Sequence, residues 1–68
     1  MRQQISYTQI PYYEVKIRTE RELLVRRFHK LDDALEYYNK HVENSIYARL
    51  REHWEGYARF IKFYSRSY

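Results

Sequence analysis

The chain has 68 residues, no cysteine, one glycine, one proline and a formal net charge of +4. So short a chain has room for only one small domain. A domain of this size buries only about 60% of the surface that its unfolded form exposes. Its thirteen Val, Ile and Leu residues are enough for one thin interface between two layers, and too few for a deep enclosed pocket. No apolar run approaches the ~20 residues that a membrane span needs.

Residues 12–30 predict a β-hairpin that follows an N-terminal extension, 1–11. Apolar and polar side chains alternate over 12–18, as in a half-buried strand, and Pro11 suits the position before a strand. A turn at 20–21 leads into the second strand. It gives the cross-strand pairs Ile17–Leu24, Tyr13–Phe28 and Glu14–Arg27. The apolar pairs then share one face, and the charge pair lies on the other.

A change of period predicts a helix at residues 31–43. Apolar residues recur there every three or four positions, which is the stripe of an amphipathic helix. Asp32 and Asp33 fall in its first turn, where the helix dipole favours negative charge. The stripe consists of Leu31, Ala34, Leu35, Tyr38 and Val42.

Residues 46–66 admit two interpretations. In one they form a second hairpin with its turn at Glu55–Gly56, where glycine supplies the positive φ that such turns need. In the other, a single helix runs over 31–55 and one strand follows, which gives the order ββαβ. We favour the hairpin, because the longer helix would place polar residues such as Arg49 on its apolar stripe. A two-residue turn predicts the pairs Leu50–Ile61, Ala48–Phe63 and Glu52–Arg59.

The favoured fold is therefore α+β: one small domain of order ββαββ, with an antiparallel sheet and one helix packed on one face. A single helix covers only one side of a sheet, so the other side meets solvent or a partner. The hairpin registers place basic and aromatic side chains on that other side. We expect ten of them to bind a partner: Tyr12, Lys16, Arg18, Arg27, Tyr47, Arg49, Arg51, Phe60, Lys62 and Tyr64.

Charge is divided unevenly along the chain. The segment 31–43 has four carboxylates and one lysine, a net charge of −3, so the rest of the chain carries +7. An acidic helix behind a basic sheet is the strongest functional signal in the sequence. Arginines outnumber lysines nine to four, and the planar guanidinium suits desolvated, two-pronged contacts with carboxylates and phosphates.

Three functions are compatible with such a face. The leading one is a non-enzymatic protein that docks on an acidic or nucleic-acid-bearing surface of a larger protein or nucleoprotein assembly and blocks it sterically. The second is direct binding of single-stranded nucleic acid, with cations along the phosphates and aromatic rings against the bases. The third is a structural homodimer that buries the apolar part of the face. Tyrosine and arginine are also ordinary residues on a sheet face that meets only solvent.

Catalysis, cofactors and metal binding are not expected. His29, His41 and His53 are spaced twelve residues apart, which matches no metal-ligand geometry, and no cysteine is present. One glycine cannot make a phosphate-binding loop. The absence of cysteine also predicts a reducing, cytoplasmic location.

In size and economy, this cysteine-free domain is similar to the accessory proteins with which phages inhibit or redirect host machinery, anti-CRISPR proteins among them. The similarity implies an inhibitor that acts in the cytoplasm of a host cell. Many such inhibitors are acidic mimics of nucleic acid, and this basic chain differs from them in charge.

Overall fold

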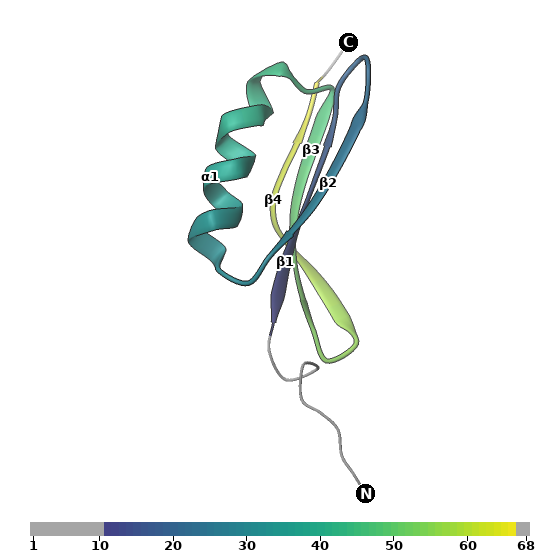
Figure 1. Cartoon of the computed structure of the whole chain (residues 1–68). Helices are drawn as coiled ribbons and strands as arrows, with labels where there is room; N and C mark the ends of the chain where they lie inside the picture. The colour runs from purple at the N-terminus through teal and green to yellow at the C-terminus, as the bar shows by residue number, and fades with distance from the viewer. Residues whose placement is uncertain (1–10, 67–68) are drawn as a thin grey trace, which may run out of the picture.

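The computed structural model describes residues 11–66, which form a four-stranded antiparallel sheet with one helix along one of its faces (Figure 1). The predicted α+β fold of order ββαββ is confirmed, and the alternative helix over 31–55 is wrong. The predicted extension 1–11 lies outside the described residues except for Pro11. In chain order the elements are β1 (Tyr12–Arg18), β2 (Leu23–Phe28), α1 (Leu31–His41), the 3-10 helix η2 (Val42–Asn44), β3 (Tyr47–Trp54) and β4 (Tyr57–Ser65).

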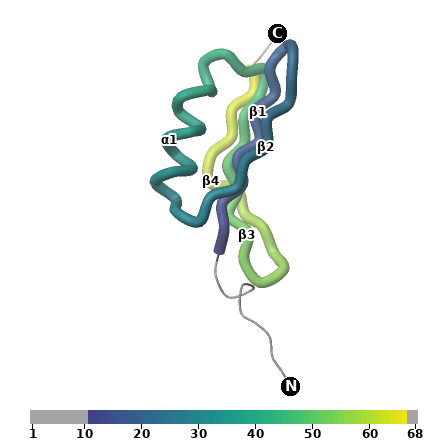
Figure 2. Tube along the Cα trace, viewed as in Figure 1, coloured from purple at the N-terminus to yellow at the C-terminus, as the bar shows by residue number. Residues whose placement is uncertain are grey.

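The two hairpins join through their first strands, which gives the sheet order β2-β1-β3-β4. In the β1–β3 pair, Val15 lies opposite Leu50 and Ile17 lies opposite Ala48. All four side chains are fully buried, so the core is centred on this pair. α1 packs on β1 and also contacts β2 and β3. Figure 2 shows it running along one side of the sheet. β4, by contrast, is half-buried only at Ile61 and exposed elsewhere.

The register of the first hairpin is confirmed. Tyr13 pairs with Phe28, Ile17 with Leu24 and Glu14 with Arg27. The Thr19 hydroxyl fixes the turn, because it accepts hydrogen bonds from the backbone N–H groups of Arg21 and Glu22 at 3.2 and 3.1 Å. A short local turn thus sets which side chains of β1 and β2 share a face.

The apolar stripe of the helix is also confirmed. Ala34 and Tyr38 are buried against the sheet, and the other three stripe residues pack around them. α1 ends at His41, two residues before the predicted end, because the chain tightens into η2. The buried Ser45 hydroxyl then donates a hydrogen bond of 2.7 Å to the Val42 carbonyl, which stops the helix and turns the chain toward β3.

The second hairpin turns where predicted and departs from the predicted register further on. Glu55 and Gly56 have φ angles of +52° and +83°, which is the left-handed backbone of a tight hairpin turn. Glu52 pairs with Arg59, as expected. Past this point the predicted pairs Leu50–Ile61 and Ala48–Phe63 are wrong. The observed pairs are Leu50–Lys62 and Ala48–Tyr64.

A β-bulge causes the difference. The register shifts at Leu50/Arg51, so that β4 contributes one extra residue, Ile61, which packs against the core. A slip of one residue moves the side chains that follow to the opposite face. Lys62 and Tyr64 therefore lie on the side of the sheet that carries α1. Their predicted position on the uncovered face is wrong.

Candidate functional site

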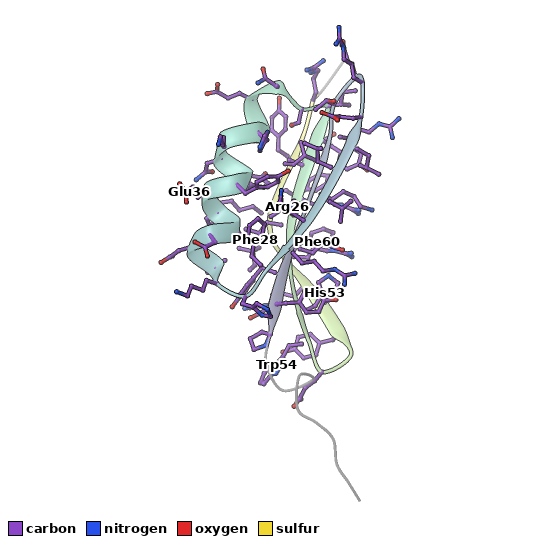
Figure 3. All side chains as sticks on the ribbon, viewed as in Figure 1. Arg26, Phe28, Glu36, His53, Trp54 and Phe60 are labelled. Atoms are coloured by element: carbon purple, nitrogen blue, oxygen red, sulfur yellow. The ribbon has the colours of Figure 1, made fainter. Side chains whose placement is uncertain are left out.

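No described segment covers the sheet face opposite α1, which we call the open face (Figure 1). Cross-strand pairing assigns its residues, because directly opposed side chains point to the same face. Eight of the ten predicted partner-binding residues lie on it. Figure 3 shows His53 and Phe60 on this side, and Phe28 between the sheet and the helix. Its larger side chains are Tyr12, Glu14, Lys16, Arg18, Leu23, Val25, Arg27, Tyr47, Arg49, Arg51, His53, Phe60 and Phe63.

One half of the open face is organised by Glu14 on β1. Its carboxylate accepts a hydrogen bond of 3.1 Å from the Arg51 guanidinium and lies 3.8 Å from that of Arg27. The Nε2 atom of His53 is 3.4 Å from the same carboxylate. Only 13% of the Glu14 side chain is exposed, so the cations around it shield the negative charge from solvent. We call these four residues the Glu14 cluster.

The pKa of Glu14 shows that the cations prevail over burial. Burial alone would raise the pKa of this carboxyl. The hydrogen bond from Arg51 and the charges of His53, Arg51 and Arg27 outweigh that effect, so the pKa is lowered from its ordinary value. Glu14 therefore stays ionised and holds its three partners in place.

The other half of the open face carries cations without such a partner. Lys16 lies directly opposite Arg49, and Arg18 lies opposite Tyr47 on the same two strands. Among residues 11–66, no carboxylate lies within ion-pair distance of Lys16, Arg18 or Arg49. We call these three residues the open cation row. Like charges that face each other across two strands destabilise a sheet, so this arrangement costs folding free energy.

Aromatic rings orient several of the guanidinium groups. The Arg49 guanidinium carbon lies 5.6 Å from the centre of the Tyr47 ring, and that of Arg51 lies 5.9 Å from the Phe60 ring. The Nε atom of Arg49 is buried without a hydrogen-bond partner among the described residues. These contacts hold the Arg49 side chain against the sheet and limit the freedom that it would lose on binding an anion.

Phe63 is the site residue that sequence reasoning missed. The bulge places it opposite Arg49 on the open face, beside Phe60, with ring centres 6.0 Å apart. The two rings are 58% and 60% exposed. The segment 60–64 has apolar residues at 60, 61, 63 and 64, which breaks strict alternation and is the signal that indicates a bulge.

The opposite side of the molecule carries the acidic residues of the helix. Asp32, Asp33 and Glu36 are exposed on α1, and Figure 3 shows Glu36 directed away from the sheet. Between α1 and β2 lies a shallow, open depression of about 260 Å³, lined in part by Phe28 and Tyr37. The Arg26 guanidinium lies over both of these rings, 6.0 and 5.4 Å from their centres. The predicted separation of an acidic helix from a basic sheet face is thus present in the fold.

Comparison with family models, with curated proteins and with solved structures found no match to this chain. The fold and site define the chain as a small α+β domain with one sheet face covered by an acidic helix and the other open and basic. No helix among residues 11–66 is long and apolar enough to cross a bilayer.

Proposed function

We propose that this protein is a non-enzymatic binding module that docks its open face on an anionic surface of a larger assembly. By covering that surface, it blocks access to it, as a small inhibitor or regulator does. The observation that carries the proposal is the open cation row, because Lys16, Arg18 and Arg49 lie together on the uncovered face without a carboxylate partner from the described chain.

The Glu14 cluster shows why the open cation row supports a binding role. The Glu14 carboxylate on the same face forms ion pairs with Arg51 and Arg27 and lies against His53. A carboxylate on this face therefore pairs with the cations of the Glu14 cluster, whereas no described carboxylate pairs with the open cation row beside them. An external anion placed between Lys16 and Arg49 would relieve their repulsion, so that binding and charge neutralisation coincide.

A homodimer formed face to face is a poorer explanation. Two copies would bring two open cation rows together without an added carboxylate, since the Glu14 carboxylate is already surrounded by its own cations. Leu23, Val25 and the two phenylalanines are apolar, but they lie on the outer strands, β2 and β4, with the cations between them. The charge at the centre of the face therefore opposes self-association and favours an anionic partner.

Retention on immobilised heparin tests the proposal with a simple polyanion. The double variant Lys16→Glu/Arg49→Glu reverses the charge of two of the three residues of the open cation row and preserves a like-charge pair at the same site. The matched control, Lys40→Glu/Lys62→Glu, changes α1 and the helix side of β4. Both variants lower the formal net charge from +4 to zero.

We expect the wild-type protein and the control to be retained and to elute at raised salt. The face variant should elute with the flow-through while its circular dichroism remains that of the wild type. Equal elution of the two variants would mean that net charge alone governs retention, and would refute a role for the open face. Failure of the wild-type protein to bind would also refute it.

A further inference from the structure

We propose that the anionic ligand of the open face is single-stranded nucleic acid, with its phosphates on the open cation row and its bases against Phe60 and Phe63. This inference rests on the proposed docking function and names the ligand of the same face. Besides the charge of the face, the inference rests on the position of two phenylalanine rings. The bulge in β4 brings Phe63 onto the basic side of the sheet, beside Phe60.

Phe60 and Phe63 would gain free energy from a ligand that covers their exposed rings. Full burial of a Phe side chain is worth roughly 1.5–3 kcal/mol, and Phe60 and Phe63 forgo more than half of it, at 58% and 60% exposed. Their ring planes meet at 71°, edge against face. Each ring thus presents a separate surface to solvent, and a nucleobase of any type can stack on such a surface.

Cations and rings are aligned across the strands. Phe63 on β4 lies opposite Arg49 on β3, which lies opposite Lys16 on β1. Adjacent strands are about 4.8 Å apart, so the ring and the two charges follow one another in that order over roughly 10 Å. A nucleotide offers the same sequence of groups, a flat base followed by a charged phosphate. An acidic peptide would satisfy the charges and leave the rings uncovered.

A duplex fits this face less well than a single strand. A double helix keeps its base faces inside the stack, so Phe60 and Phe63 would meet only its backbone. A helix is the element that usually enters the major groove, and in this protein α1 carries the acidic residues Asp32, Asp33 and Glu36, which phosphates repel. The open face carries Glu14 as its only described carboxylate, and its own cations enclose that charge.

Fluorescence anisotropy with labelled oligo-dT and oligo-U of about ten nucleotides, a length within the range of single-strand sites, tests the inference. We expect binding that weakens with salt at a log–log slope of about −2, since each neutralised phosphate contributes about −0.7. Lys16→Gln should make this slope shallower by about 0.7. Phe63→Leu should weaken binding about 5- to 150-fold, the range that loss of one stacked base gives, and leave the slope unchanged.

Tyr64→Leu is the matched control for the ring, because Tyr64 follows Phe63 on β4 but lies on the side of α1. It should bind both oligonucleotides as the wild type does. Phe63→Leu with wild-type affinity, or equal binding of a duplex of the same length, would overturn the inference. Because Tyr64 is exposed on an outer strand, we expect the Tyr64→Leu variant to fold. Circular dichroism tests this.

A labelled decaglutamate peptide separates this inference from the docking function on which it rests. Binding of that peptide without binding of the oligonucleotides would overturn the nucleic-acid ligand and preserve the docking role for an acidic protein. Binding of neither probe, together with no retention on heparin, would overturn both. A molecular mass that doubles with concentration and no bound probe would assign the face to a second copy instead, and would also overturn both.

Discussion

The open face contains two groups of cations that differ in one respect. In the Glu14 cluster, a carboxylate with 13% of its side chain exposed lies against Arg51, Arg27 and His53. In the open cation row, Lys16 and Arg49 face each other directly and no described carboxylate reaches them. Both groups have residues on β1 and β3, and Glu14 and Lys16 are two positions apart on β1; Arg27 of the Glu14 cluster lies on β2.

The difference separates a structural role from a binding role. Charges that are satisfied within the fold add to its stability and have little left to offer a ligand. Charges that repel one another within the fold reduce its stability, and the repulsion disappears when an anion binds between them. Loss of the Glu14 charge should therefore lower stability and strengthen anion binding. Loss of a charge in the open cation row should raise stability and weaken anion binding.

Removal of the central carboxylate should have the largest effect on the fold. Glu14→Gln leaves the half-buried Arg51 without its charged partner, and hydrogen bonds to charged groups contribute about 1.5–3 kcal/mol. We expect the free energy of unfolding to fall by about 2 kcal/mol, which lowers Tm by roughly 10 °C in a domain of this size. Thermal unfolding followed by circular dichroism measures the change.

Glu43→Gln is the control for that experiment, because Glu43 is exposed on η2 and has no ion pair among the described residues. Its Tm should remain close to that of the wild type. Glu14→Gln should also bind heparin more tightly, since Arg51 and Arg27 lose their internal partner. Equal Tm values for the two variants would show that the Glu14 cluster does not stabilise the sheet.

Acid should remove the same contribution gradually. The pKa of Glu14 is lowered in the folded state, so its stabilising effect is fully present above the unfolded-state value of about 4.3 and is lost as the pH falls through the lowered folded-state value. The stability difference between wild type and Glu14→Gln should therefore shrink below about pH 4.3. Urea unfolding at a series of pH values measures it. A difference that stays constant down to acid pH would contradict the assigned charge state.

Charge reversal in the open cation row should have a smaller effect, and of the opposite sign. Lys16→Glu replaces a repulsive pair with Arg49 by an attractive one. Cross-strand charge pairs contribute roughly 0.2–1 kcal/mol, so we expect Tm to rise by up to roughly 6 °C. Retention on heparin should fall at the same time. A variant that is both less stable and equally well retained would remove Lys16 from the proposed site.

The smallest effect is expected on the other side of the sheet. Lys62→Glu makes the same change of charge as Lys16→Glu, but the bulge places Lys62 opposite Leu50, on the side of α1. Its stability should stay within about 0.5 kcal/mol of the wild type, as for most surface substitutions. Its elution from heparin should shift much less than that of Lys16→Glu. Equal shifts for the two variants would mean that the face of the sheet makes no difference.

Much of the fold could be predicted because its signals are local. The first hairpin has a two-residue turn and one register that satisfies both faces, so Tyr13–Phe28 and Ile17–Leu24 follow from alternation alone. The buried positions Ala34 and Tyr38 follow from the helical period. The bulge was not predicted, because the broken alternation over 60–64 does not tell which residue is extra until Ile61 is packed against a core built by other strands.

The candidate site was predicted in composition more accurately than in arrangement. The sequence by itself determined that an acidic helix would oppose a basic, aromatic sheet face, because strand alternation and helical period each assign side chains to faces over a few neighbouring residues. Only the tertiary structure decided that β1 pairs with β3 and that β4 bulges. Those two features bring Lys16 opposite Arg49, add Arg51 and His53 to the predicted partner Arg27 around Glu14, and place Phe63 beside Phe60. Both features depend on how the two hairpins pack together under one helix. This packing brings together residues such as Lys16 and Arg49, which are more than thirty positions apart in the chain.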